Sequence, residues 1–193
     1  MIAIIDYNAG NIQSVRFALN RLGIEPVLTN DAEQLQKAEK VIFPGVGEAG
    51  TAMKFLKEKN LDKLIPQLSQ PVLGICLGLQ LMCRHSEESN TDCMNIFPLY
   101  VKKFPASLKV PHIGWNTIFT LKSPLFKGCN ENSYVYYVHS YFAEKGENTI
   151  GETDYINPFS AALQKDNFYA VQFHPEKSSS VGEHLLKNFL ALR

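Results

Sequence analysis

The sequence has 193 residues, of which 45% are hydrophobic, 20% charged and 11% aromatic. A chain of this size and composition can bury a core without disulfides or metal, so we expect one folded domain spanning residues 1–193. Lys and Arg together number 19, as do Asp and Glu, so the formal net charge is zero. The balance gives no indication of a nucleic-acid-binding or anionic-membrane-binding surface.

No apolar run is long enough to cross a membrane, and the first apolar run meets Asp6 too early for a signal peptide. The cysteines are sparse and form no CxxC pair, which fits neither a disulfide framework nor a zinc site. They are Cys76, Cys83, Cys93 and Cys129. We therefore expect a reduced, cytoplasmic protein without bound metal, in which an important cysteine acts through its reactivity.

The first half of the chain alternates compact apolar runs with segments of helical periodicity. We expect strands at 2–6, 25–29, 41–43 and 71–75, and helices at 11–22, 31–38, 49–58, 61–68 and from Cys76 to about Arg84. Asn8, Ala9 and Gly10 predict a turn, and Asp31 can cap the second helix. Because the strands are continuously apolar, they are typical of a parallel sheet covered on both faces.

Between Phe97 and Phe173 the pattern changes to alternating or aromatic stretches, such as 133–138 and 167–173, separated by turn signals. These stretches indicate antiparallel hairpins added to the sheet. A last helix is expected at about 180–191. The predicted fold is α/β, an open twisted, mostly parallel sheet with helices on both faces and antiparallel strands at one edge.

The segment Gly74-Ile75-Cys76-Leu77-Gly78 joins an expected strand to an expected helix. Its G-x-C-x-G form is the thiol counterpart of the nucleophile elbow, a sharp strand-to-helix turn that exposes the nucleophile. Glycines are needed because side chains beside the turn would collide with neighbouring elements, and the following helix N-terminus favours a thiolate. Free cysteines are usually small buried hydrophobic residues. We interpret Cys83 in that way, whereas the setting makes Cys76 the candidate nucleophile.

A thiol nucleophile needs an imidazole base and a carboxylate that orients it. His174 follows a strand-like run and is followed by Pro175 and Glu176. Residues separated by one position project to the same side of an extended chain, so His174 and Glu176 can act as a pair. Pro175 fixes the backbone between them. A solvated loop could hold the same residues, but together with the elbow they complete a candidate triad.

Pro44-Gly45-Val46-Gly47 follows the third expected strand. Acyl transfer needs preorganised N–H donors where an oxyanion forms, and this loop and the N–H of Leu77 could supply them. Gly45–Gly50 is also a G-x-G-x-x-G pattern, which can bind a dinucleotide pyrophosphate. Its position after the third strand, its opening Pro44 and the absence of an acid within 65–70 argue against that alternative.

These three motifs and their order resemble the class I (triad) glutamine amidotransferases, and the resemblance spans nearly the whole chain. Within that class the sequence is similar to the glutaminase subunits of imidazole glycerol phosphate synthase, a family of histidine biosynthesis. The narrower resemblance lies in segments 6–11, 111–116, 138–141 and 173–179. The polar stretch 85–97 departs from the family's pattern.

The resemblance implies that L-glutamine is hydrolysed to glutamate and ammonia, without a cofactor. By position, Cys76 attacks the amide carbonyl to form a γ-glutamyl thioester, which water then hydrolyses. His174 removes the thiol proton and protonates the leaving ammonia, and Glu176 orients His174. The oxyanion is stabilised by backbone groups of Val46, Gly47 and Leu77. Ammonia passes to a (β/α)8 cyclase subunit in a heterodimer that serves histidine synthesis and releases a purine by-product.

By the same resemblance, a pocket holds the α-amino and α-carboxylate groups of glutamine. Its residues are Gly47, Gln80, Glu88, Ser140 and Tyr141. The carboxylate of Glu88 suits a substrate ammonium, although it could also be a solvated acid beside Glu87. Gln80 lies one helical turn after Cys76 and therefore faces the same way.

Ammonia released into water would be protonated and lost as a nucleophile, so its exit should be sealed against the partner protein. The positions that face or gate that partner in the resembling family are Asn11, Trp115, Tyr136 and Lys177. Trp115 and Tyr136 could equally be ordinary aromatic core residues.

Three alternatives stay open at this point. A glutaminase that feeds a different synthase would use the same ammonia-producing chemistry. A cysteine peptidase on a related α/β fold would share the elbow and a histidine. A dinucleotide-binding or regulatory module would use the glycine-rich segment Gly45–Gly50 instead.

Overall fold

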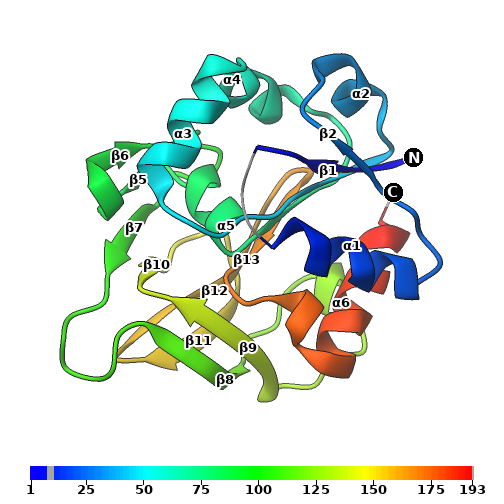
Figure 1. Ribbon diagram of the computed structural model, residues 1–193. Helices are drawn as coiled ribbons and strands as arrows, with labels where there is room; N and C mark the ends of the chain where they lie inside the picture. The colour runs from blue at the N-terminus through cyan, green and yellow to red at the C-terminus, as the bar shows by residue number, and fades with distance from the viewer. Residues whose placement is uncertain (8–10, 193) are drawn as a thin grey trace.

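The computed structural model describes residues 1–7 and 11–192. These residues form a seven-stranded sheet in the order β11-β12-β13-β4-β3-β1-β2, a four-stranded sheet and a two-stranded ribbon. Figure 1 shows helices on both sides of the large sheet, with the two smaller sheets at one end of it. The turn expected at residues 8–10 lies outside the described residues.

Five strands of the large sheet run in parallel, and the first four of them confirm the expected core of the fold. They are β1 (Ile2–Ile5), β2 (Val27–Thr29), β3 (Lys40–Phe43), β4 (Val72–Ile75) and β13 (Phe168–Val171). Two antiparallel strands, β12 (Asn157–Lys165) and β11 (Thr149–Tyr155), extend the sheet beyond β13. The sheet is therefore mostly parallel with antiparallel strands at one edge, as predicted.

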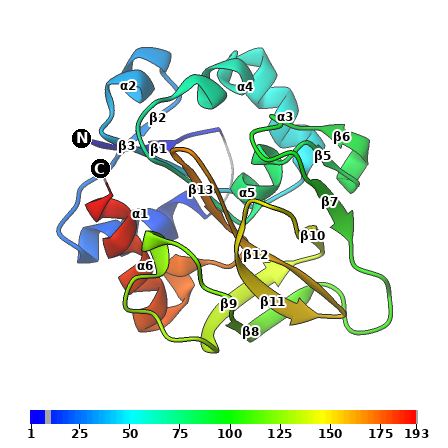
Figure 2. The ribbon, with the colours of Figure 1, turned by 180° about the vertical axis from the view of Figure 1, so that it is seen from behind.

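Successive side chains of the parallel strands enter two different cores, because a strand alternates its faces. Val41 and Phe43 pack on one side, whereas Ile42 and Leu73 pack on the other. The first side is covered by α2 (Ala32–Lys37), α3 (Ala49–Glu58), α4 (Leu61–Leu64) and α5 (Leu77–Met82). The second is covered by α1 (Ile12–Arg21) and α6 (Ser179–Ala191), which lie side by side in Figures 1 and 2.

The helices agree with the expected positions except at two ends. The expected helix 61–68 is divided into α4 and a 3-10 turn, Ile65–Gln67, that contains Pro66, which has no N–H for a helical bond. The helix expected to reach Arg84 ends at Met82, because Cys83 has extended backbone. Asp31 caps α2 as predicted, since its side chain accepts from the N–H of Gln34.

The second half departs from the prediction in how its hairpins are placed. The stretch 167–173, expected in an antiparallel hairpin, forms β13, which pairs antiparallel with β12 but parallel with β4 inside the large sheet. β8 (His112–Ile118) and β9 (Ser133–His139) do not join the large sheet and pair with each other as a separate ribbon. A further sheet has the order β10-β7-β5-β6. Its strands are β5 (His85–Ser86), β6 (Thr91–Asp92), β7 (Tyr100–Lys103) and β10 (Tyr141–Ala143), and β5 runs parallel to β7. Three 3-10 turns complete the elements, at Glu88–Asn90, Pro124–Phe126 and Pro175–Lys177.

Candidate active site

Cys76 forms a strained turn between β4 and α5. Its backbone has φ 54° and ψ −107°, a region that residues with a side chain rarely adopt. A Cβ on Gly78 would lie 1.9 Å from the carbonyl oxygen of Phe43, and one on Gly74 would lie 2.8 Å from the Sδ of Met82. The structure thus gives both glycines the steric role that the sequence pattern suggests.

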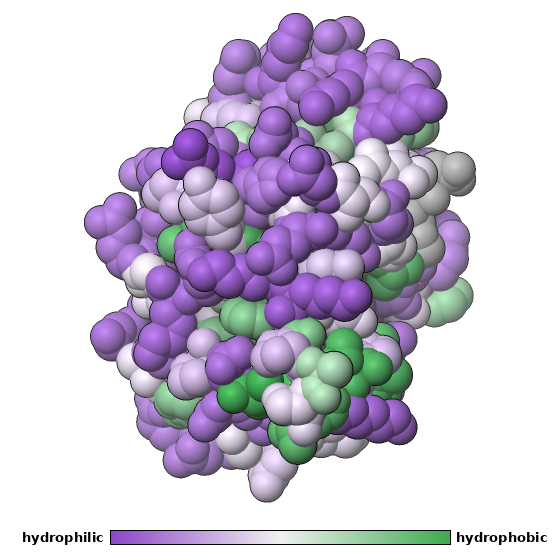
Figure 3. Space-filling view, turned by 90° about the vertical axis from the view of Figure 1, so that its left-hand side faces the viewer, coloured by the Kyte–Doolittle hydropathy of each residue, from purple (hydrophilic) through white to green (hydrophobic). Residues whose placement is uncertain are grey.

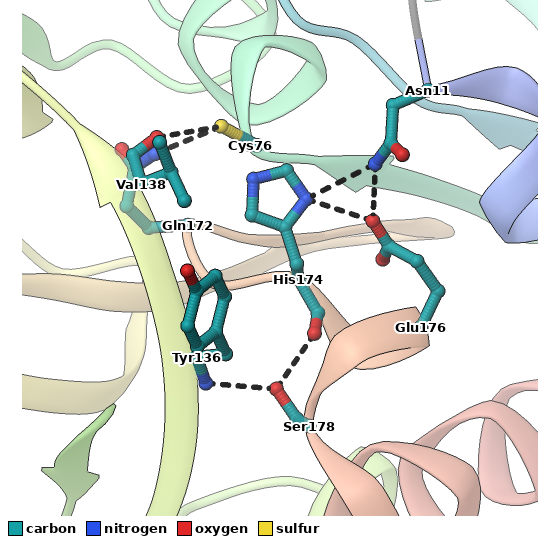
Figure 4. Close-up of polar contacts among 8 residues, drawn as sticks. All are labelled: Asn11, Cys76, Tyr136, Val138, Gln172, His174, Glu176 and Ser178. Carbon is teal, nitrogen blue, oxygen red and sulfur yellow. Dashed lines mark hydrogen bonds and ion pairs between the residues drawn. The ribbon is translucent and has the colours of Figure 1, made fainter. Parts of the chain in front are cut away.

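His174 follows the strand next to Cys76. β13 runs parallel to β4 with Val171 opposite Ile75, and the N–H of Cys76 donates to the carbonyl oxygen of Val171 at 2.8 Å. The carboxyl ends of adjacent parallel strands meet at one edge of a sheet, where sites of α/β proteins form. Figure 4 shows the imidazole of His174 between the side chains of Cys76 and Glu176.

The His174 ring is held by Glu176 and by Asn11. Nδ1 of His174 lies 2.8 Å from Oε1 of Glu176, and the side chains are 2% and 0% exposed. A carboxylate oxygen only accepts, so Nδ1 carries the proton of this bond and Nε2 lies on the side of Cys76. Nδ2 of Asn11 donates to the same Oε1 at 2.5 Å. The arrangement is that of a base and the acid that orients it.

The electrostatics of this cluster favour a charged imidazole. Burial alone would lower the pKa of His174, but hydrogen bonds and charges of Cys76 and Glu176 outweigh burial and raise the pKa to about 10. In contrast, burial raises the pKa of Cys83, Cys93 and Cys129. A raised pKa disfavours the thiolate at these three cysteines, and Cys76 is the cysteine whose hydrogen bond and charge act on His174.

Ser178 anchors the backbone of His174, a role that the sequence analysis missed. Its Oγ donates to the carbonyl oxygen of His174 at 2.6 Å and accepts from the N–H of Tyr136 at 2.9 Å. The N–H of His174 in turn donates to the carbonyl oxygen of Tyr136 at 2.9 Å. The ribbon strand β9 therefore fixes the position of the candidate base (Figure 4).

A cavity of about 320 Å³ opens in front of Cys76. It brings together nearly all of the residues to which the sequence analysis gave a role in catalysis, oxyanion binding or glutamine binding. Its lining includes Val46, Gly47, Cys76, Leu77, Gln80, Glu88, Ser140, Tyr141 and His174. Glu176 lies behind His174 and faces a second cavity.

Glu88 lies at the N-terminus of α3 and lines the cavity. Its Oε2 accepts from the N–H of Ala49 at 2.8 Å, and the carboxylate of Glu48 accepts from the N–H groups of Gly50 and Thr51. Burial raises the pKa of Glu88, although the bond from Ala49 acts in the opposite direction. Two carboxylates thus occupy N–H groups that would hold a pyrophosphate, which argues against the dinucleotide alternative.

The expected oxyanion donors are not all free in this conformation. The N–H of Leu77 donates to the carbonyl oxygen of Gly45 at 3.3 Å, a long and weak bond. Gly47 has φ 119°, and a Cβ there would contact nothing. Backbone conformation, not crowding, is thus the reason for glycine at that position. The loop can therefore turn a peptide group toward the cavity without a steric cost at Gly47.

Two of the four residues expected to face a partner lie at a second cavity of about 480 Å³, and one of them, Lys177, lines the first cavity as well. Trp115 and Lys177 line it together with Glu176. Trp115 is 52% exposed and contacts the ring of Tyr136 edge to face. The indole is therefore a surface side chain, which contradicts the ordinary-core alternative for that residue. Asn11 links this side of the molecule to Glu176 through its hydrogen bond.

The described part of the chain gives no sign of a metal or of a membrane segment. No cluster of at least three His, Cys, Asp or Glu residues in 1–7 and 11–192 could hold a metal ion. In the same residues no helix has the length and hydrophobicity needed to span a bilayer.

Comparison with known proteins shows the family and the fold of the chain. The family described as glutamine amidotransferase class-I matches residues 3–192. The imidazole glycerol phosphate synthase subunit HisH of Bacteroides fragilis is 62% identical over 194 residues, covering 99% of each chain. The corresponding subunit of Bacteroides thetaiotaomicron is 61% identical over the same shares. A crystal structure of a glutamine amidotransferase aligns with TM-score 0.77 at 18% identity and covers 98% of this chain and 97% of its own, which supports the fold.

These matches extend over the full length of the relatives and include every segment that lines the cavity. The protein belongs to the class-I glutamine amidotransferases and, within them, to the HisH family of imidazole glycerol phosphate synthase subunits.

Proposed function

We propose that this protein is the glutaminase subunit of imidazole glycerol phosphate synthase and that Cys76, His174 and Glu176 form its catalytic triad. The observation that carries the proposal is the strained thiol of Cys76 in one cavity with His174, which is bonded to Glu176 at 2.8 Å. Because membership of the HisH family rests on matches of about 60% identity, glutamine hydrolysis is the activity to which this geometry is assigned.

The reaction begins with attack of the Cys76 sulfur on the side-chain amide carbonyl of glutamine. His174 holds the thiol proton and transfers it to the departing nitrogen, so that ammonia leaves and a γ-glutamyl thioester remains. Water then attacks the thioester, His174 takes its proton, and glutamate leaves while the thiol is restored. Glu176 keeps the imidazole in one orientation through both steps.

The oxyanion of each tetrahedral intermediate is stabilised by the N–H of Leu77 and by the loop at Val46 and Gly47. In the resting structure the Leu77 N–H is bonded weakly to Gly45, so the oxyanion must compete with that carbonyl or displace it. An oxyanion is the stronger acceptor because a hydrogen bond to a charged oxygen is about twice as strong as a neutral one. The free conformational space of Gly47 allows the loop to adjust.

Glutamine is held by its α-amino and α-carboxylate groups at the other end of the cavity. Glu88 is a half-buried carboxylate whose pKa is raised by burial and, to a smaller extent, by the like charge of Glu48. A substrate ammonium would relieve this unfavourable setting. Gln80, Gly47 and the backbone of Ser140 and Tyr141 complete the pocket for the remaining polar atoms.

Ammonia must reach a partner before it is protonated, and a (β/α)8 cyclase subunit in a heterodimer is the partner we propose. The outer face of the β8–β9 ribbon carries exposed apolar side chains, namely Ile113, Trp115, Tyr134 and Val138. Exposed apolar patches of this kind are typical of protein contacts. In Figure 3 hydrophobic residues also gather in the lower part of one face, at the end of the molecule where Figure 1 shows the β8–β9 ribbon. Asn11, Tyr136 and Lys177 would face or gate the same partner.

The proposal places the protein in the cytoplasm, in histidine synthesis, where its partner releases a purine by-product. The test uses the complex of this chain with its cyclase. Cys76→Ala should abolish glutamine-dependent formation of imidazole glycerol phosphate and leave the reaction with added ammonium salts intact. Cys129→Ala, a control at a half-buried thiol outside the cavity, should change neither reaction.

Two results would contradict the proposal. If Cys76→Ala also lost the ammonium-dependent reaction, the substitution would act through folding or docking, not through the nucleophile. If the chain neither bound a (β/α)8 partner nor supported glutamine-dependent synthesis, it would feed a different synthase. Labelling of Cys76 by peptide-based electrophiles in preference to diazo-oxo-norleucine would favour a cysteine peptidase.

A further inference from the structure

A glutamine side chain that the proposed mechanism does not use lies beside the nucleophile. Gln172 follows the last ladder residue of β13, and the parallel register of Val171 with Ile75 brings it level with Cys76. Its side chain is fully buried. Nε2 of Gln172 lies 3.7 Å from Sγ of Cys76, within the range of an N–H···S hydrogen bond (Figure 4).

The orientation of this amide follows from its neighbours. The carbonyl oxygen of Tyr141 can only accept, so the group of Gln80 that lies 2.9 Å from it must be the Nε2 amide nitrogen. The same Nε2 lies 3.1 Å from Oε1 of Gln172. Since Gln80 donates there, Gln172 presents its oxygen to Gln80 and must present its N–H to the sulfur of Cys76.

A buried histidine pair holds the far end of this chain of hydrogen bonds. Nδ1 of His139 lies 2.8 Å from the carbonyl oxygen of Tyr141, and its Nε2 lies 2.9 Å from Nδ1 of His112. Burial lowers the pKa of His139 to about 3 and that of His112 to about 4, so both rings are neutral at pH 7. His139 therefore donates through Nδ1 to Tyr141 and accepts from His112, whose Nε2 accepts from Asn116.

The sulfur of Cys76 has a second polar neighbour, which favours the neutral thiol and not the thiolate. The carbonyl oxygen of Val138 lies 3.8 Å from Sγ of Cys76 and can accept from a thiol S–H. It would repel a thiolate, whereas the N–H of Gln172 would stabilise one. Removing the Gln172 donor would leave the carbonyl unopposed and shift the sulfur toward the neutral thiol.

We propose that Gln172 is a positioning residue that donates to the sulfur of Cys76 and favours its thiolate, through an amide orientation fixed by Gln80 and Tyr141. The proposal rests on the proposed function, because it matters only if Cys76 is the nucleophile. Other titratable or charged groups line the cavity or act on Cys76, and a substitution at position 172 leaves them in place. They are Tyr7, Glu88, His139, Tyr141, His174 and Lys177.

The test measures the pH dependence of Cys76 alkylation by iodoacetamide in the full chain, with the modified peptide quantified by mass spectrometry. Gln172→Met keeps the length of the side chain and removes the donor. We expect its alkylation midpoint to rise by about 1 pH unit, since a bond to a charged acceptor contributes at least that much. Glutaminase kcat at pH 7 should fall about tenfold with little change in KM, and should recover as the pH rises.

Gln164→Met is the matched control, because Gln164 is a half-buried amide on the neighbouring strand β12 that bonds to Ser123 and not to sulfur. It should leave the midpoint unchanged. If Gln172→Met does not fold, Gln172→Glu still accepts from Gln80 and turns an oxygen toward the sulfur, so its midpoint should rise further. A midpoint equal to that of the native chain in either folded variant would overturn the proposal.

The proposed function fails in a different way. If the native chain does not hydrolyse glutamine and Cys76 alkylates no faster than the other three cysteines, the nucleophile assignment is wrong whatever Gln172 does. If the native chain hydrolyses glutamine through Cys76 and the substitutions leave its titration unchanged, only the role of Gln172 is wrong.

Discussion

Tyr7 and Gly45 lie so close together that Tyr7→Phe should reduce the loss of folding stability caused by Gly45→Ala. The hydroxyl of Tyr7 is buried and has no hydrogen-bond partner among the described residues. Burial, with a smaller contribution from the charge of Cys76, raises the pKa of Tyr7, so the hydroxyl stays protonated. A Cβ at Gly45 would lie 1.9 Å from that oxygen, 3.0 Å from Cβ of Leu77 and 3.3 Å from Cζ of Tyr7.

The expected free energies follow from these contacts. Tyr7→Phe removes a buried hydroxyl without a partner, so we expect it to stabilise the fold by up to about 1 kcal/mol. Gly45→Ala forces the hydroxyl to move by more than 1 Å and should cost about 2–3 kcal/mol. In the Tyr7→Phe background that contact is gone and only those at 3.0 and 3.3 Å remain, so the cost should fall to about 1 kcal/mol.

The assay is denaturant unfolding of the native chain, both single variants and the double variant, analysed as a double-mutant cycle. We predict a coupling energy of about 1–2 kcal/mol. Tyr137→Phe is the control, because its buried hydroxyl lies 2.5 Å from Oγ1 of Thr153, and its loss should destabilise by about 1 kcal/mol. Additivity within about 0.5 kcal/mol, or a destabilising Tyr7→Phe, would refute the reasoning.

NMR titration should place the pKa of His174 near 10, and Cys76→Ala should lower it because the bond and charge of the sulfur are lost. Because the pKa of His174 is raised from 6.5 to about 10 in the folded state, its protonation stabilises the fold fully below pH 6.5. This stabilisation is lost as the pH rises toward 10. The unfolding midpoints measured at pH 6 and at pH 10 should therefore differ more in the native chain than in Cys76→Ala. Gly78→Ala would place a Cβ 1.9 Å from the carbonyl oxygen of Phe43, which cannot rotate away, so we expect at least about 3 kcal/mol of destabilisation in thermal or chemical unfolding. Ser178→Ala leaves a partly buried N–H of β9 without its acceptor and should cost about 1–3 kcal/mol, with lower glutaminase kcat because the backbone of His174 is released.

The parallel part of the fold could be predicted because its signals are local. Continuous apolar runs mark the strands, and α3 begins and ends where the periodicity of 49–58 does. The second half could not be placed in the same way, because the alternating or aromatic patterns in 133–138 and 167–173 do not say which sheet a strand joins. That choice depends on partners far along the chain, such as the parallel pairing of β13 with β4.

The candidate site likewise contains residues that local motifs indicate and residues that depend on distant parts of the chain. Short motifs determine the local geometry of the elbow around Cys76 and of the pair His174 and Glu176, so the sequence alone indicates these residues. Ser178 and Gln172 act through neighbours that only the fold supplies. One signal was present for Gln172: a polar amide in the apolar run 169–173 must find a partner when the strand is buried.

The most direct test of the account is covalent labelling of the native chain with diazo-oxo-norleucine, followed by peptide mapping. The account predicts a single adduct on Cys76, protection by glutamine, and no adduct in Cys76→Ala. Labelling of Cys83, Cys93 or Cys129 in place of Cys76, or glutamine hydrolysis that persists in Cys76→Ala, would contradict it.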